Sequence, residues 1–260
     1  MFAAGTTVVN VHFANLDQRP CKDVTLVLTP FMGMEQERYS AEIDAATSTA
    51  VFSLELKGTG LCHLTNDAIP HTSDIYLAPG ETVEVCCDMR EVFKRERQLN
   101  SPGPVLNMIP VTTDGHYADV NNHERLLSDA LTDVSDVAKR HYSAAFSSSE
   151  EAASALLDDY WKMCKAVVDE PGSDMQKALK ILRLRLSVIE AAGMAGKIMD
   201  KVCLQSVFEA VDVYDVRLLF LGAPSVIMAA FAAGMHKEIL PDCPLVAYYE
   251  KMTGALIQHI

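Results

Sequence analysis

The chain has 260 residues, of which 49% are hydrophobic and 22% charged, and its formal net charge is −13 at pH 7. This length and balance are typical of one large or two ordinary globular domains with a substantial core. Binding to nucleic acid or to an anionic membrane surface requires clustered Lys and Arg, so the acidic composition argues against both kinds of partner.

The first 115 residues show the two-residue period of strands with one face in the core. Apolar residues alternate with other residues from Val9 to Phe13, from Val24 to Leu28 and from Phe52 to Leu56. Turn-like segments separate these runs: residues 15–20, 30–33, 44–49, 57–60 and Pro79-Gly80. Several short strands at this spacing predict an antiparallel β-sandwich-like module over residues 1–115.

The run Thr82–Met89 contains two adjacent cysteines. Alternation along a strand points Cys87 into the core and Cys86 outward, between Glu84 and Asp88. Neighbouring carboxylates disfavour the thiolate that a reactive cysteine needs. We therefore predict that both cysteines are inert strand residues, in preference to a redox or metal-binding pair.

From about Asp119 the period changes to 3.6, which predicts an α-helical module over residues 116–260 and an α+β fold. The first expected helix is capped near Asn121 and continues to Ala138. Its apolar stripe consists of Leu127, Leu131, Val134 and Ala138.

Two capping-box patterns predict further helices. Ser148 with Glu151 precedes one helix, Ser173 with Gln176 precedes the next, and Pro171-Gly172 separates them. Additional helices are expected from about residue 215 to 240 and from about residue 244 to the end.

The segment Leu218–Met235 has 18 residues without a charge, which is close to the length that spans a bilayer. Residues 222–225, Gly-Ala-Pro-Ser, interrupt it, so we predict two short buried helices and a chain that does not span the membrane. An apolar stripe then continues from Tyr248 to Ile260 without a closing signal, which suggests that the natural chain continues.

The polar clusters give weak signals for chemistry. Cys62, His63 and His71 resemble part of a zinc site, but a third and fourth ligand at useful spacing are missing, so we favour no metal here. The seven cysteines include no Cys-x-x-Cys pair, and a disulfide framework is not expected.

A second polar cluster consists of Asp114, His116, Asp119 and His123. Helix capping and solvation explain it better than cation binding. The carboxylate pairs Glu150-Glu151 and Asp158-Asp159 are interpreted as solvated helix faces. Trp161 is predicted to be a core residue, with the floor of a sugar site as the alternative.

The chain contains no nucleophile elbow, no phosphate-binding loop, no dinucleotide fingerprint and no HExxH motif. We therefore predict no catalytic residue, no cofactor and no metal ligand. The least favoured alternative is an enzyme that uses Cys86 or the residues from His116 to His123.

Three segments together resemble a known family. They are an aspartate and turn before Phe-x-Leu-x-Leu (44–56), Leu-x-Pro-Gly-Glu-x-Val-x-Val-x-x-Asp (77–88) and Asp-Gly-x-Tyr-Ala-x-x-Asn (114–121). This pattern resembles the N-terminal region of thioredoxin-like thiol-disulfide oxidoreductases from the envelope of anaerobic Gram-negative gut bacteria, and the likeness covers essentially all 260 residues.

In that family a β-rich module and a helical segment precede a thioredoxin domain that carries a Cys-x-x-Cys pair. This chain lacks the pair, so the resemblance transfers no catalytic residue to it. It implies a periplasmic or envelope location with a removed signal peptide. It also implies an accessory or docking role toward a C-terminal thioredoxin-like domain or its protein substrates. The alternative is an independent carbohydrate- or peptide-binding envelope protein with its ligand near His116, Tyr117 and Trp161.

Overall fold

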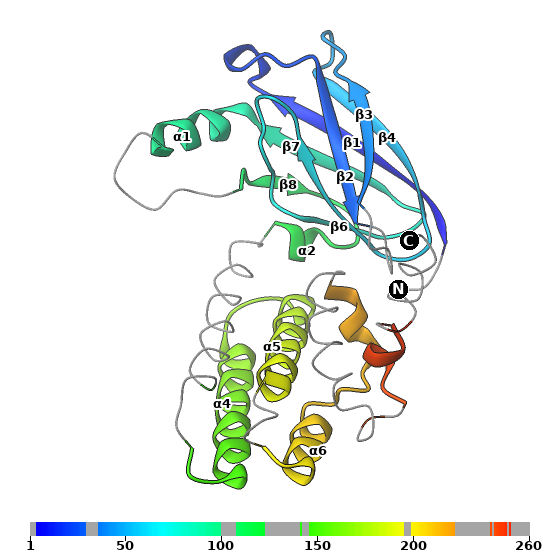
Figure 1. Ribbon diagram of the computed structural model, residues 1–260. Helices are drawn as coiled ribbons and strands as arrows, with labels where there is room; N and C mark the ends of the chain where they lie inside the picture. Colours follow the sequence, from blue (N-terminus) through cyan, green and yellow to red (C-terminus); the bar gives the residue numbers. More distant parts are fainter. Residues whose placement is uncertain are drawn as a thin grey trace, which may run out of the picture. The chain divides into compact units, whose positions relative to one another are not determined.

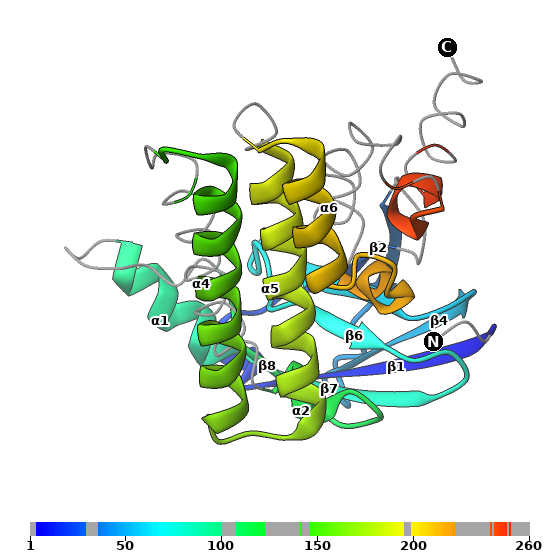
Figure 2. The ribbon, with the colours of Figure 1, turned by 90° about the horizontal axis from the view of Figure 1, so that it is seen from below.

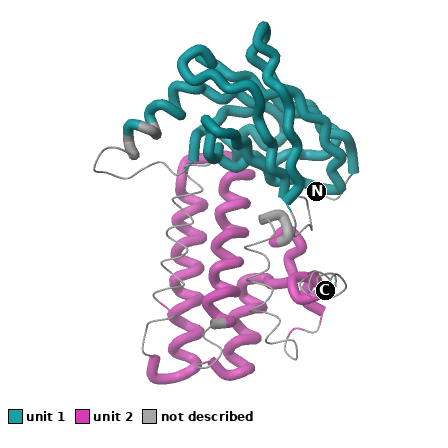
Figure 3. Tube along the Cα trace, turned by 45° about the horizontal axis from the view of Figure 1, so that its top comes forward, with its two compact units in different colours: residues 1–124 teal, residues 125–260 magenta. Residues whose placement is uncertain are grey.

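The computed structural model describes residues 4–29, 36–99, 108–122, 141, 146–194, 199–221, 240, 242–248 and 250. The chain forms two compact units, residues 1–124 and residues 125–260 (Figure 3). All described strands lie in the first unit, and the long helices lie in the second (Figure 1). The predicted α+β fold, with strands before helices, is confirmed.

Unit 1 is a sandwich of two four-stranded sheets (Figure 1). The first sheet has the order β4 (Thr49–Leu56), β1 (Gly5–Ala14), β7 (Thr82–Asp88), β8 (Val111–Thr113). The second has the order β3 (Glu37–Glu42), β2 (Asp23–Thr29), β5 (Gly60–Thr65), β6 (Ile75–Leu77). Alternate residues of both sheets form one hydrophobic core, in which Val9, Leu26, Leu54, Leu64 and Val85 are fully buried.

One strand pair departs from the predicted antiparallel arrangement. β1 and β7 run parallel, from Val8 opposite Thr82 to Ala14 opposite Asp88. The alternation of apolar residues specifies which face of a strand is buried, but neither the direction of the strand nor its neighbour. The four alternating runs were therefore predicted correctly as strands, and the antiparallel direction was wrong for this pair.

Several short elements have no clear signal in the sequence. β3 is exposed or half-buried along its whole length, and β6 and β8 have three residues each. Helix α1 (Met89–Leu99) follows β7 directly, without an intervening turn. A hydrophobic period cannot be recognised in three residues, nor in an edge strand that buries neither face.

Residues 116–122 belong to unit 1, although the change of period assigned them to the helical module. Helix α2 (Ala118–Asn121) has one turn, and the prediction that Asn121 caps a helix was wrong. The Asn121 side chain accepts a hydrogen bond from Tyr76 N (2.8 Å) and donates one to Tyr76 O (3.1 Å). Asn122 makes the same pair of bonds with Thr113 N and O, at 2.6 and 2.8 Å.

These two consecutive asparagines thus satisfy backbone groups of β6 and β8, each of which is one of the two edge strands of its sheet. The remainder of the helix expected up to Ala138 lies outside the described residues, as does His123.

Unit 2 is built on three helices that pack on one another: α4 (Ser149–Asp169), α5 (Asp174–Met194) and α6 (Lys201–Ala210) (Figure 2). The first predicted cap is confirmed, because Ser148 Oγ accepts from Glu151 N. So is the second: Gln176 N donates to Ser173 Oγ, and Ser173 N donates to Gln176 Oε1. The cap of α6 was not predicted; Asp200 supplies it by accepting from Cys203 N at 2.9 Å.

Side-chain burial in unit 2 shows that the prediction for Trp161 was wrong. Leu156, Ile189 and Phe208 are fully buried, and Tyr160 is 2% exposed, whereas Trp161 is 54% exposed. Successive helical residues are rotated by about 100°, so the neighbour of a central core residue points toward solvent. Trp161 is therefore a surface residue.

The long uncharged segment from Leu218 is described only at its start, where the 3-10 helix η2 (Val216–Leu221) ends. Residues 222–239, on which the two predicted short helices mostly fall, lie outside the described part of the chain. Residues 244–248 are helical, while Tyr249 and residues 251–260 also lie outside it. Among the described residues, no helix has the length and apolar character needed to cross a bilayer.

A part-buried carboxyl on α5 leads to a prediction. Burial raises the pKa of Glu190 above its ordinary value. A raised folded-state pKa means that the ionised form weakens folding once the pH exceeds the unfolded pKa. Glu190→Gln should therefore increase Tm at pH 7 by a small amount, on the order of 1–3 °C, because solvent still screens the charge. The gain should disappear as the pH falls below about 4. Equal gains at pH 4 and pH 7 would contradict this assignment.

Candidate functional site

Two of the three segments that carry the family resemblance, 77–88 and 114–121, bond to each other within unit 1. Glu81, in the Pro-Gly-Glu turn, accepts a hydrogen bond from Ala78 N through Oε1 at 2.8 Å. Its other oxygen, Oε2, accepts one from His116 N at 3.0 Å. Thr7 of β1 closes the same turn, since its Oγ1 donates to Ala78 O and accepts from Gly80 N. One carboxylate thus joins the second and third segments.

The third segment is held by its own characteristic residues. Asp114 N donates to Glu84 O, and Asp114 Oδ1 accepts from Glu84 N at 2.6 Å. Gly115 has φ +90, a conformation that L side chains rarely adopt, and a Cβ there would lie 3.2 Å from Glu81 Oε2. Tyr117 OH lies 3.0 Å from Thr59 Oγ1. These hydrogen bonds are all made within the fold of unit 1.

The predicted polar cluster near the end of unit 1 is not a metal-binding group among the described residues. Asp114 contacts the β7 backbone, while His116 and Asp119 are exposed. His123 lies outside the described part of the chain.

The paired cysteines lie as predicted. Cys86 is exposed, whereas Cys87 is fully buried, and burial raises the pKa of the Cys87 thiol to about 12. Cys62 is also buried, and burial raises the pKa of its thiol strongly. All seven cysteines lie within the described residues, and all are free thiols.

Thiol labelling of the native protein checks this arrangement. Cys86 should react first and no faster than an ordinary exposed cysteine, because it is the exposed thiol of the chain. Cys62, Cys87 and Cys243 should react only after unfolding, because all three are buried. Mass spectrometry of digests taken during the reaction identifies each site, and Cys86→Ser should remove the earliest phase. Labelling of Cys86 much faster than that of a free thiol would contradict the assignment.

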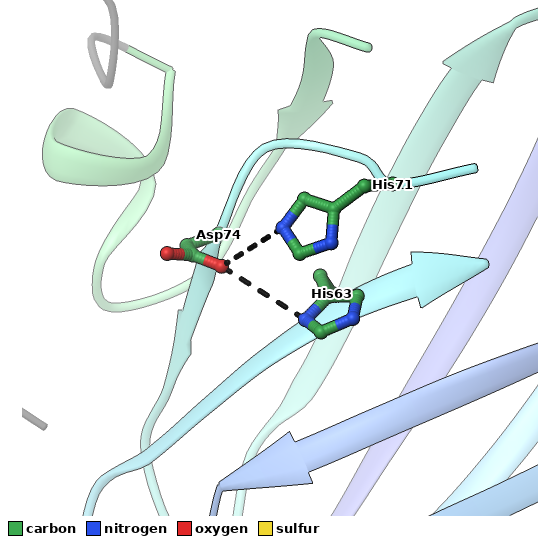
Figure 4. Close-up of side chains that lie close together, drawn as sticks. All are labelled: His63, His71 and Asp74. Atoms are coloured by element: carbon green, nitrogen blue, oxygen red, sulfur yellow. Dashed lines mark ion pairs between the residues drawn. The ribbon is translucent and has the colours of Figure 1, made fainter. Parts of the chain in front are cut away.

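A different group of side chains has the composition of a ligand set. His63 on β5, His71 and Asp74 lie together, and their potential ligand atoms are within 4.8 Å of one another (Figure 4). Asp74 Oδ1 is 4.0 Å from His63 Nδ1 and 3.7 Å from His71 Nε2. The two imidazole centroids are 3.8 Å apart, with the rings tilted by 36°. Burial lowers the pKa of His63, and the adjacent His71 lowers it further.

The β5–β6 pairing brings His63 and Asp74 together. Leu61 lies opposite Tyr76 and Cys62 opposite Ile75, so the same register places His63 opposite Asp74. His71 reaches the group from the loop between these strands. The sequence had indicated His63 and His71, and the ligand it missed is Asp74. Asp74 is found when the β5–β6 register is extended by one residue beyond the pair Cys62–Ile75.

Cys62, which the sequence grouped with these histidines, is not part of the cluster. It alternates with His63 on β5 and lies in the sandwich core with 1% exposure. Adjacent strand residues point to opposite faces of a sheet, so the thiol and the imidazole face opposite ways.

Two other polar groups in unit 2 have structural explanations. Glu150, Asp200 and Cys203 lie close enough to hold an ion, but Asp200 caps helix α6 through the backbone of Cys203. The buried His141 lies with Nε2 3.0 Å from Asp159 Oδ2. Asp159, predicted to be solvated, therefore pairs with a buried histidine, while Asp158 is exposed as expected.

No protein-family model matches this chain, and no curated protein or solved structure is significantly similar to it. The resemblance to thioredoxin-like oxidoreductases therefore depends on the three sequence segments alone. The contacts that these segments make in unit 1 support the function proposed below.

Proposed function

We propose that this chain is a non-catalytic accessory region of a thioredoxin-like thiol-disulfide oxidoreductase of the periplasm or cell envelope. Its role is to dock the redox domain or to present protein substrates to it. The observation that supports the proposal is that two of the resembling segments, 77–88 and 114–121, bond to each other through Glu81 and Asp114. Hydrogen bonds of this kind stabilise the β-sandwich, as is expected of residues with a scaffolding role.

The reading frame of the natural gene is the first test. Downstream of the codon for Ile260 we expect a strand followed by Cys-x-x-Cys, and upstream of the β module we expect a signal peptide. A frame that ends soon after Ile260, or that continues without such a redox pair, would overturn the proposal.

Enzyme kinetics provide the second test. The full-length protein and its isolated redox domain should reduce a small disulfide such as oxidised glutathione with equal kcat/KM. On folded proteins with disulfides, removal of residues 1–260 should increase KM by about tenfold while kcat stays constant, as expected for the loss of roughly 1.4 kcal/mol of docking energy. Equal KM values on protein substrates would refute the docking role.

The exposed indole of Trp161 favours a second candidate, a carbohydrate- or peptide-binding protein. Aromatic faces exposed to water are suited to stacking on sugars or on apolar peptide side chains. Trp161 is the single tryptophan of the chain, so its fluorescence reports such binding directly. Titration with a panel of glycans and peptides, together with thermal shift, tests this function. Saturable quenching would favour it over the accessory role, and an unchanged spectrum and Tm throughout the panel would eliminate it.

A further inference from the structure

The cluster of His63, His71 and Asp74 offers two imidazole nitrogens and one carboxylate oxygen to a common point (Figure 4). Imidazole suits Zn²⁺, Cu²⁺, Fe²⁺ and Ni²⁺, whereas Mg²⁺ and Ca²⁺ require oxygen ligands. Two histidines and a carboxylate, with one position left for water, form an established zinc ligand set. The composition of the cluster therefore selects first-row transition ions and excludes the hard cations.

The spacing of the donor atoms is compatible with an ion between them. Asp74 Oδ1 is 4.0 Å and 3.7 Å from the two ring nitrogens, too far for a hydrogen bond to either. Around a tetrahedral ion with bonds of ~2.0–2.1 Å, neighbouring donors lie ~3.3 Å apart. Small side-chain rotations would bring the three donors to that spacing. The carboxylate oxygen lies at ion-pair distance from both imidazoles, so the three donors converge on one region (Figure 4).

The backbone that carries these ligands is held firmly. Thr72, between His71 and Asp74, is fully buried; its backbone N donates to Leu64 O at 3.0 Å, and its Oγ1 accepts from Leu64 N at 2.8 Å. Ile109 N donates to His71 O at 2.9 Å. The start of the loop is closed by Asn66, whose Oδ1 accepts from the N of Ala68 and of Ile69. Ligands on a backbone fixed in this way lose little freedom when an ion binds.

Exposure indicates what kind of site it would be. The His63 side chain is 16% exposed, that of His71 36% and that of Asp74 39%. The ion would thus contact protein on one side and solvent on the other. A closed structural zinc site has four protein ligands, whereas three leave an exchangeable position.

From this donor set, spacing and support we propose that His63, His71 and Asp74 form a binding site for one divalent transition-metal ion, with Zn²⁺ as the best match. His63 Nδ1, His71 Nε2 and an Asp74 carboxylate oxygen are the protein ligands, and water occupies the remaining position. The site is independent of the proposed accessory function.

Calorimetric titration of the chelator-treated 260-residue protein with Zn²⁺ tests the proposal. We expect one ion per chain with a Kd of ~10 µM or tighter. His71→Ala and Asp74→Asn should each weaken binding by more than the ~10–100-fold that loss of a supporting outer residue causes. His12→Ala and Cys86→Ser are the matched controls and should leave the Kd unchanged. They remove the exposed histidine paired with Glu84 and the exposed thiol opposite it on β7.

A spectroscopic measurement keeps the test valid if a ligand variant folds poorly. In long-range ¹H–¹⁵N spectra of the wild-type chain, Zn²⁺ should shift Nδ1 of His63 and Nε2 of His71, while the other histidines stay unchanged. The proposal is overturned if the wild-type protein does not bind Zn²⁺ in this range, if Cys86→Ser abolishes binding, or if the shifted resonances belong to other histidines.

Discussion

Phe208→Ala is expected to reduce the free energy of unfolding of unit 2 by about 3–5 kcal/mol, the usual cost of removing a buried aromatic side chain. Phe208 lies on α6 and is among the largest fully buried side chains in the described part of the chain. Its loss removes apolar contacts and leaves a cavity that three packed helices can only partly fill. Urea unfolding followed by Trp161 fluorescence measures the effect, because the only tryptophan lies in unit 2.

Tyr214→Ala is the matched control for this measurement. Tyr214 is also an aromatic residue of unit 2, but it is 41% exposed. Its removal should cost less than about 1 kcal/mol, as is usual for surface substitutions. Similar losses for the two variants would mean that α6 does not pack on the core as the structure has it.

Asn121→Ala is expected to destabilise unit 1 by about 2–4 kcal/mol, because it leaves a buried N–H and a buried C=O of Tyr76 without their partner. The side-chain amide of Asn121 has both a donor and an acceptor, as a backbone peptide group does. It therefore bonds to Tyr76 in the way that a neighbouring strand would bond to β6. Chemical denaturation followed by circular dichroism measures the loss. Hydrogen exchange should in addition show a faster rate at the amide of Tyr76.

Asn122→Ala tests whether burial causes the effect. Asn122 makes the same two bonds with Thr113, but it is exposed and its bonds are only part-buried. Water can replace a partner at an exposed site, so the expected loss is nearer 1 kcal/mol. An Asn122 variant that loses as much stability as the Asn121 variant would contradict this explanation.

The parts of the fold that the sequence predicted are those governed by local rules. Four strands, β1, β2, β4 and β7, followed from two-residue alternation, and two helix starts followed from side chains that bond to backbone three residues away. Non-local pairing was not accessible in this way. Nothing in the local pattern of β7 indicates that its neighbour β1 runs parallel to it, since the intervening strands of both sheets determine that direction.

Only part of the candidate metal site could be predicted from the sequence, again because strand pairing is non-local. The sequence grouped His63 and His71 with Cys62 and favoured no metal there. Replacing Cys62 by Asp74 required the register between β5 and the three-residue strand β6. The prediction that Trp161 lies in the core was wrong for a different reason. The apolar stripe through Leu156 and Tyr160 already defined the buried face of α4, and Trp161 lies one residue away from that stripe. The prediction followed the general preference of large aromatic residues for cores. The position of Trp161 on the helix, outside the apolar stripe, would have predicted its exposure correctly.

The adjacent positions of Asn121 and Asn122 have a consequence for self-association. An unpaired strand edge is a template on which another copy can add a strand, and here one short segment blocks two such edges at once. A single proteolytic cut or local opening at residues 121–122 would uncover β6 and β8 together. The segment thus protects these two edges from strand addition, and its loss would leave both open to pairing with another copy of the chain.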